Sequence, residues 1–256
     1  MSLLAINNVS LGYGAKTVVK DLTFSLERGE IFGLLGPNGS GKTTLVSAIE
    51  GLHPVMAGEI LLNNIPTSRA SVRSQIGVML QVNAYPNELT TAELVRLFAG
   101  LYGKDWSKKC VLEWLQGFHL ENLANQHVST LSGGQQQMVA LAIGLINQPA
   151  LSIFDEPTTG LDPQSRRMLW ESINRLRDEG HTVMLTTHSM EEAAALCNRI
   201  AILINGHIRA LDTPQGLIMC HANDPWIKKI GHGAVTLDDV FIGLVNAEKG
   251  DQYDAQ

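Results

Sequence analysis

The amino-acid sequence predicts an α/β fold with a parallel sheet, an N-terminal antiparallel β-subdomain and an inserted α-helical subdomain. Apolar segments of strand length alternate with helical segments in much of the chain. This alternation is typical of parallel sheets, because parallel strands need crossover connections. Short apolar segments separated by glycines fill the first 30 residues, and helical periodicity begins near residue 91. The 256 residues suffice for one large domain or two closely packed subdomains.

The N-terminal part is expected to contain short strands. The apolar, strand-like segments are residues 4–9, 18–19, 22–26, 31–35 and 76–80. Residues 59–62, followed by Asn63 and Asn64, predict a β-hairpin, because two asparagines favour a tight turn.

The middle of the chain has helical periodicity from residue 91 to residue 146. Two sets of apolar residues each share one helical face: Leu94, Leu97, Phe98 and Leu101, and then Val111, Leu112, Leu115 and Phe118. We therefore expect a helical subdomain at about residues 88–147, inserted into the sheet.

Strand–helix alternation returns in the second half. We expect strands at residues 151–154, 182–187 and 200–204, and helices at residues 163–177 and 190–197.

Composition limits the possible functions. The net charge of −6 and the 5% aromatic content disfavour a nucleic-acid partner, whose binding needs basic stripes and often stacking rings. The N-terminus has no secretory signal and no apolar segment is long enough to cross a bilayer, so we expect a cytoplasmic protein. Its three scattered cysteines are expected to be reduced.

A complete phosphate-loop motif follows the apolar segment 31–35. Its residues are Gly36, Pro37, Asn38, Gly39, Ser40, Gly41, Lys42 and Thr43. The glycines let backbone N–H groups form an anion nest, and the helix expected from Lys42 onward adds its positive dipole end. Lys42 can reach the terminal phosphates of a nucleoside triphosphate, and the Thr43 hydroxyl can hold Mg²⁺.

Two carboxylates follow the apolar strand at residues 151–154. Asp155 is placed to orient Mg²⁺ beside a phosphate loop. Glu156 lies one residue further and is a candidate general base for the attacking water.

A second anion-binding helix start lies at Ser132, Gly133, Gly134 and Gln135. One nucleotide needs only one phosphate loop. A second such helix start therefore suggests that another molecule completes the site.

These motifs, together with Gly160-Leu161-Asp162 and His188, follow the order found in ATP-binding cassettes. From about residue 3 to residue 216 the chain closely resembles the nucleotide-binding subunit of an ABC transporter. The resemblance implies a P-loop NTPase (RecA-like) core, an ATPase domain over residues 1–216 and a short C-terminal extension over residues 217–256.

The resemblance also implies roles for single residues. Tyr13 would stack on adenine, and Asn38 to Thr44 would surround the phosphates. Gln81 would contact Mg²⁺ and the attacking water, Asp162 would cross the dimer, and His188 would contact the γ-phosphate. Met138, Ile143 and Gly144 stand where many cassettes have Arg, Arg and Ala, so the surface of that helix is expected to differ.

Partners follow from the same resemblance. The subunit would dimerise around two Mg-ATP, as a homodimer or a closely related heterodimer. It would bind a separate transmembrane permease on the inner face of the cell membrane. Residues 81–90, with an exposed Tyr85, would line the groove that receives the permease.

Two segments, residues 76–103 and 236–241, resemble the ABC-2-type exporters, which move drugs, peptides, lipids or polysaccharides. The alternatives are an importer subunit, a non-transport cassette and an inactive nucleotide sensor. The short C-terminal part argues against an importer, and the single phosphate loop argues against a non-transport cassette. The presence of both Glu156 and His188 argues against an inactive sensor.

Overall fold

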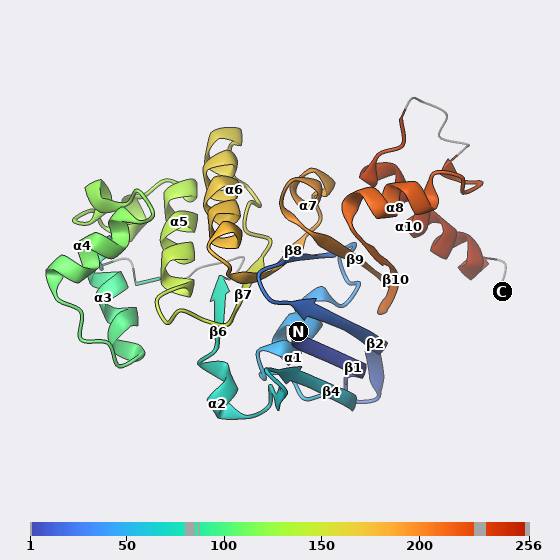
Figure 1. The fold of residues 1–256 in the computed structure, drawn as a ribbon, viewed down its shortest axis with the longest axis horizontal. Helices are drawn as coiled ribbons and strands as arrows, with labels where there is room; N and C mark the ends of the chain where they lie inside the picture. Colours follow the sequence, from blue (N-terminus) through green and yellow to red (C-terminus); the bar gives the residue numbers. More distant parts are fainter. Residues whose placement is uncertain (1, 80–84, 87, 228–233, 254–256) are drawn as a thin grey trace.

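Two β-sheets form the centre of the molecule, and groups of helices lie at its two ends (Figure 1). The computed structural model describes residues 2–79, 85–86, 88–227 and 234–253. The predicted α/β fold, with an antiparallel N-terminal part and a helical insertion, is confirmed.

The first sheet is antiparallel, with the order β2-β1-β4-β5. Its strands are β1 (Ser2–Tyr13), β2 (Lys16–Glu27), β4 (Ala57–Leu62) and β5 (Ile65–Pro66). The predicted hairpin joins β4 to β5, and Asn63 and Asn64 form its turn with φ angles of 53° and 60°. This left-handed conformation suits asparagine and explains the Asn-Asn pair.

The second sheet has the order β10-β9-β3-β8-β7-β6. Its strands are β3 (Ile31–Leu35), β6 (Ile76–Met79), β7 (Leu151–Asp155), β8 (Thr182–Thr187), β9 (Arg199–Ile204) and β10 (His207–Asp212). All neighbours are parallel except β10, which pairs antiparallel with β9. The sequence did not predict β10, an edge strand with mostly half-buried residues.

The second sheet has a hydrophobic cluster on each face. In β8, Val183 and Leu185 face the cluster that contains residues of α6 (Pro163–Asp178) and α7 (Met190–Leu196), whereas Met184 faces the cluster that contains residues of α1 (Lys42–Ile49). Helices thus cover both faces, as parallel sheets require.

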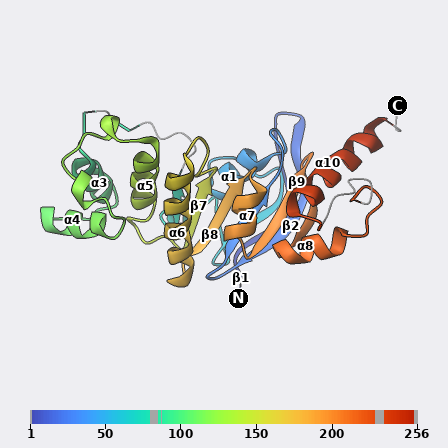
Figure 2. The same ribbon diagram turned by 90° about the horizontal axis from the view of Figure 1, so that it is seen from above.

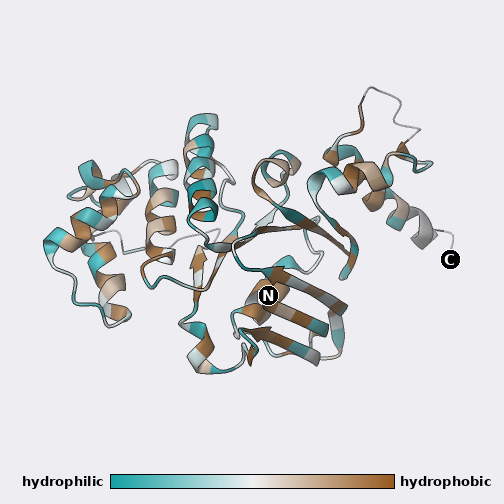
Figure 3. Cartoon of the chain, viewed as in Figure 1, coloured by the Kyte–Doolittle hydropathy of each residue, from teal (hydrophilic) through white to brown (hydrophobic). Residues whose placement is uncertain are grey.

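The helical insertion contains α3 (Thr91–Leu101), α4 (Lys108–Gln116) and α5 (Gly133–Gly144), with the 3₁₀ turns Glu121–Leu123 and Val128–Thr130 before α5. Every residue of α5 from Met138 onward is buried. Hydrophobic residues accordingly gather on α5 and the strands, while the outer helix α6 is largely hydrophilic (Figure 3).

The predicted buried face of α3 is partly wrong. Leu94 is buried, but Leu97 and Leu101 are 45% and 71% exposed. Val95 and Ala99 are buried instead, so the contact stripe is rotated toward them. In α4, Leu112 is likewise exposed.

Tyr85 is half-buried rather than exposed. Its ring packs edge-on against Phe98 of α3, with 5.9 Å between ring centroids. Burial raises the pKa of Tyr85 to about 12.

The C-terminal part returns to the second sheet. Helices α8 (Pro214–His221) and α10 (Leu237–Tyr253) lie side by side, at the end of the molecule away from α3 and α4 (Figure 2). Glu248 of α10 accepts a hydrogen bond from Asn205 at 3.1 Å and pairs with Arg209, which ties α10 to β10 and to the turn before it. A short helix α2 (Ala70–Arg73) precedes β6. Within the described ranges, no helix combines the length and apolarity needed to span a membrane.

Candidate active site

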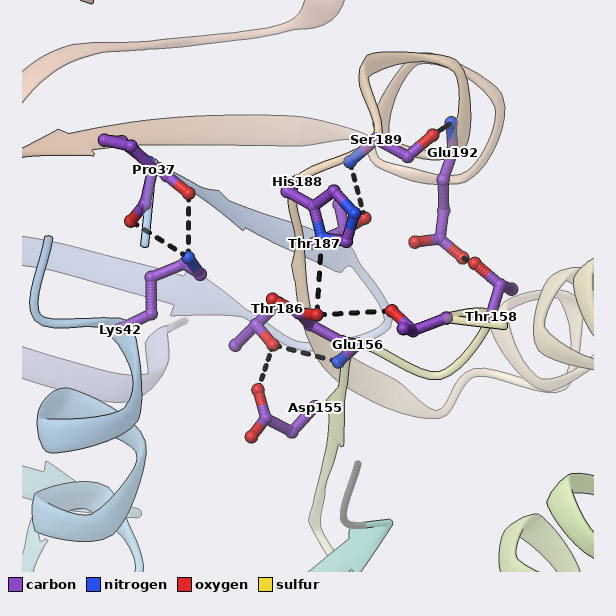
Figure 4. Close-up of polar contacts among 12 residues, drawn as sticks. Pro37, Lys42, Asp155, Glu156, Thr158, Thr186, Thr187, His188, Ser189 and Glu192 are labelled. Atoms are coloured by element: carbon purple, nitrogen blue, oxygen red, sulfur yellow. Dashed lines mark hydrogen bonds and ion pairs between the residues drawn. The ribbon is translucent and has the colours of Figure 1, made fainter. Parts of the chain in front are cut away.

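One cavity of about 830 Å³ collects side chains from the ends of several strands. It is lined by Tyr13, Val18, Asn38, Gly39, Gly41, Lys42, Thr43, Thr44, Asp155, Glu156, Thr159 and His188. Strands β3, β8 and β7 are parallel neighbours, so the segments that follow them meet at one edge of the sheet. Polar side chains that sequence reasoning drew from distant positions thus face one another (Figure 4).

The glycine-rich loop between β3 and α1 has a backbone that only glycine adopts easily. Gly39 and Gly41 have φ angles of 79° and 110°. A Cβ on Gly41 would lie 2.6 Å from a methyl group of Val19, so a side chain there would clash as well. The loop ends at the N-terminus of α1, where free N–H groups and the helix dipole favour an anion.

Lys42 is held against this loop. Its Nζ donates hydrogen bonds to the carbonyl oxygens of Gly36 at 2.7 Å and Pro37 at 3.3 Å (Figure 4). Burial lowers the pKa of Lys42, and the nearby carboxylates of Glu156 and Asp155 oppose that shift. The ammonium therefore has a fixed position, and desolvation outweighs the effect of the two carboxylates on its pKa.

Thr186 of β8 fixes the Asp155 carboxylate and the backbone of Glu156 at the end of β7. The Thr186 hydroxyl donates to Asp155 Oδ1. The backbone N–H of Glu156 donates to the carbonyl oxygen and the hydroxyl of Thr186, at 3.0 and 3.1 Å. Glu156 has a φ of 48°, which is uncommon for a residue other than glycine and is often found at functional sites.

This conformation brings Glu156 to His188. The distance from Glu156 Oε2 to His188 Nδ1 is 3.3 Å, and the Thr159 hydroxyl donates to the same Oε2 at 3.2 Å. The Glu156 side chain is 13% exposed and that of His188 is 57% exposed. A shielded carboxylate beside an exposed imidazole suits proton transfer at a surface cleft.

Tyr13 and Thr43 lie at the rim of the cavity. Tyr13 ends β1, is 60% exposed, and its ring centroid is 4.7 Å from that of His53. Thr43 is exposed at the start of α1, whereas Thr44 is buried. Tyr13 can therefore offer a free ring face, and Thr43 a free hydroxyl position, to a ligand in the cleft.

The helix start at Ser132 lies apart from this cleft. Ser132 caps α5: its hydroxyl accepts from the Gln135 N–H, and the Gln135 side chain accepts from the Ser132 N–H. With Gly134, these residues line a separate cavity of about 210 Å³ against α6. A Cβ on Gly134 would lie 2.3 Å from Ser165 Oγ, so glycine is required there for packing.

Asp162 caps α6. Its carboxylate accepts hydrogen bonds from the Ser165 hydroxyl at 2.6 Å and from the N–H groups of Gln164 and Ser165. The bonds from Ser165, followed by that from Gln164, lower the pKa of Asp162. The structure thus brings neither Asp162 nor Ser132 to Lys42 within one chain. Gln81 lies outside the described residues.

A family model for the ABC transporter matches residues 19–159, more than half of the chain. The chain belongs to the ABC transporter family.

Relatives of this ABC protein include the Nod factor export ATP-binding protein I of Paraburkholderia xenovorans (strain LB400). The two are 38% identical over 246 residues, which is 94% of this chain and 81% of the relative. A solved ATP-binding subunit of an ABC transporter superposes with a TM-score of 0.79 at 30% identity, covering 95% of this chain and 99% of that chain. A dimeric ATP-binding cassette in a post-hydrolysis state, bound to ADP and Pi, gives a TM-score of 0.73 at 30% identity, covering 82% and 98%. The predicted family and fold are confirmed, and this chain is an ATP-binding subunit with ATP hydrolase activity.

Sequence reasoning about this ABC subunit missed two threonines of the site, Thr159 and Thr186. Both donate to the carboxylates at the end of β7. The available signals were the threonine pairs Thr158-Thr159, which begins two residues after Glu156, and Thr186-Thr187, which directly precedes His188. Thr186 lies next to the end of a buried and mostly apolar strand, and a buried polar side chain in such a place is expected to need a hydrogen-bond partner.

Proposed function

We propose that the cleft binds Mg-ATP and that Glu156 and His188 promote attack of water on the γ-phosphate, in a subunit that powers export through a separate permease. The observation that carries this proposal is the convergence of Lys42, Asp155, Glu156 and His188 on one cleft from three adjacent strand ends.

The phosphates would bind at the N-terminus of α1. Backbone N–H groups between Asn38 and Thr44 would donate to them, and Lys42 would add its charge where negative charge accumulates. Adenine would stack on the exposed ring of Tyr13.

The donors beside Lys42 suit a magnesium ion. The Thr43 hydroxyl and the Asp155 carboxylate line the same cleft and are the hard oxygen ligands that Mg²⁺ prefers. We propose Gln81 as a further ligand, on resemblance to the family. An ion held there would supply positive charge beside the phosphate that is cleaved.

Glu156 would act as the general base. Its carboxylate would accept a proton from the attacking water, while His188, 3.3 Å away, would contact the γ-phosphate. The hydrogen bond that the Thr159 hydroxyl donates to Glu156, and the one that the Glu156 N–H donates to Thr186, would hold this end of β7 in place for that step.

A second subunit would complete each site. Ser132, Gly133, Gly134 and Gln135 lie apart from Lys42 in one chain, so a partner would present them to the ATP bound by this one, and Asp162 would cross between the two. The resemblance to a dimeric cassette supports this arrangement. The pair would be a homodimer or a closely related heterodimer.

Export is supported by the name of the relative, a Nod factor export ATP-binding protein. We propose that this subunit binds a transmembrane permease at the inner face of the cell membrane and drives export of a drug, peptide, lipid or polysaccharide. The exposed Leu97 and Leu101 of α3 offer apolar surface for such a partner. An importer subunit is the alternative.

The test of the active site is Lys42→Ala, assayed with the purified full chain. We expect no measurable ATP hydrolysis and weaker ATP binding, because the charge beside the phosphates is lost. Lys109→Ala is the matched control, since the Lys109 side chain is 85% exposed on α4, and it should hydrolyse ATP normally. Normal turnover by Lys42→Ala would refute the proposed site.

A further inference from the structure

Glu192 is a buried carboxylate for which the proposed mechanism has no use. It lies on α7, one helical turn after His188, and is 1% exposed. Burial of a carboxylate is unfavourable unless hydrogen bonds compensate for the lost water. The contacts of Glu192 therefore indicate what its burial achieves.

Two side chains from different segments donate to one oxygen of Glu192. The Thr158 hydroxyl donates to Oε1 at 2.8 Å, and Trp170 Nε1 of α6 donates to the same atom at 3.1 Å. The backbone N–H of Glu192 donates to the hydroxyl of Ser189, which caps α7 directly after His188 (Figure 4). Glu192 thus joins the start of α7, the middle of α6 and the segment after β7.

The segment after β7 contains the proposed base. Thr158 is two residues after Glu156, and the next residue, Thr159, donates to Glu156 Oε2. Glu156 itself has a left-handed backbone with a φ of 48°. Such a conformation persists only where surrounding contacts fix it, and the bond from Thr158 to Glu192 lies two residues further along the same segment.

We propose that Glu192 is a positioning residue, which fixes the segment that carries Glu156 against the helix that follows His188. The two catalytic side chains, 3.3 Å apart, keep their relative position because Thr158 is hydrogen-bonded to Glu192 on α7, the helix that follows His188. This inference rests on the catalytic roles proposed above for Glu156 and His188.

A purely structural role would have a different signature. Both Thr158 and Trp170 stabilise the same buried oxygen, so the loss of either donor should reduce folding stability to a similar extent. Only Thr158 belongs to the segment that carries Glu156. Loss of the bond from Thr158 should therefore lower the catalytic rate, and loss of the bond from Trp170 should not, whereas loss of either bond should lower the folding stability.

The experiment compares Thr158→Val with Trp170→Phe in the full chain. Each variant removes one donor to Glu192 Oε1. Thr158→Val preserves the side-chain shape, whereas Trp170→Phe also replaces the indole by a smaller ring and so loses packing. We expect Thr158→Val to lower kcat for ATP hydrolysis by roughly tenfold with KM changed less than about twofold, since a small displacement of a catalytic group mainly affects the transition state. Trp170→Phe should keep kcat within about twofold of the wild type, although its loss in Tm should be at least as large as that of Thr158→Val.

Two further variants complete the test. Thr158→Ser retains the hydroxyl and should restore most of kcat. Glu192→Gln retains an oxygen that accepts both hydrogen bonds and should stay within about threefold of the wild type, whereas Glu192→Ala should match Thr158→Val. Equal kcat losses in Thr158→Val and Trp170→Phe, a full kcat in Thr158→Val, or a Glu192→Gln as impaired as Glu192→Ala would each overturn the proposal.

Glu156→Gln separates this inference from the proposed function. If Glu156→Gln retains wild-type kcat, then the catalytic assignment itself fails. If Glu156→Gln is inactive while Thr158→Val is normal, then the catalytic assignment stands and the positioning role of Glu192 fails.

Discussion

Replacement of Tyr13 by alanine should weaken binding of ATP without affecting the chemistry. Tyr13 is 60% exposed and packs against His53, so removal of its ring should have little effect on folding. Base–aromatic stacking contributes about 1–3 kcal/mol, which corresponds to a Kd for the nucleotide about 5- to 150-fold higher. The Tyr13 ring lies at the rim of the cleft, whereas the carboxylates of Asp155 and Glu156 lie at the end of β7. Loss of the ring should therefore change kcat at saturating ATP by less than about twofold.

The assay is calorimetric titration with a non-hydrolysable ATP analogue and, in parallel, with tripolyphosphate, each with Mg²⁺. Tripolyphosphate has no base, so its affinity should be the same for wild type and Tyr13→Ala. Tyr13→Phe keeps the ring and should bind the ATP analogue within about twofold of the wild type. The reasoning is refuted if Tyr13→Ala binds the ATP analogue as tightly as the wild type, or if it loses affinity equally for tripolyphosphate.

Two other changes test the site and its surroundings. Glu156→Gln should bind ATP, hydrolyse it very slowly and accumulate as a closed dimer, because the base is lost and the phosphate contacts remain; light scattering that shows only monomer at saturating Mg-ATP would contradict the dimer. At the end of α1, burial raises the pKa of Glu50 from 4.5 to about 7, and the nearby Asp155 adds to this shift. Between these pH values the folded state holds a proton that the unfolded state has lost. The folded state therefore becomes less stable as pH rises through that window. Glu50→Gln should remove this dependence and raise Tm more at pH 8 than at pH 5, measured in the presence of EDTA. An equal change in Tm at both pH values would show that the folded state does not raise the pKa of Glu50.

The elements of the second sheet other than β10 were predictable because their signals are local. The strand at Thr182–Thr187 matches its expected bounds, and the helix at Pro163–Asp178 begins where an Asp-Pro pair predicts a capped start. The glycine-rich loop was recognisable because its backbone conformation restricts the residues at Gly39 and Gly41.

Contacts between distant segments were not predictable in the same way. Helical periodicity identified an apolar stripe on α3, but only the position of neighbouring elements determines that Val95 is covered and Leu101 is not. The bond between Thr158 and Glu192 joins residues 34 positions apart, and neither residue alone signals the other. Edge strand β10 escaped prediction because an edge needs no continuous apolar run.

The position of β3 in the sheet has a consequence for synthesis of the chain. Strand β3 leads into the phosphate loop, and its partners in the sheet are β8 and β9, which pair with it through residues 183–187 and 199–202. The loop is therefore made early by the ribosome, but the strand that leads into it pairs with β8 through residues 152 positions apart, such as Ile31 and Val183, and with β9 later still. Contacts of such long sequence separation form slowly, because a large chain entropy must be lost first. Retention on immobilised ATP should consequently appear late in a series of stalled nascent chains, once β9 has left the exit tunnel, and so mark completion of the sheet.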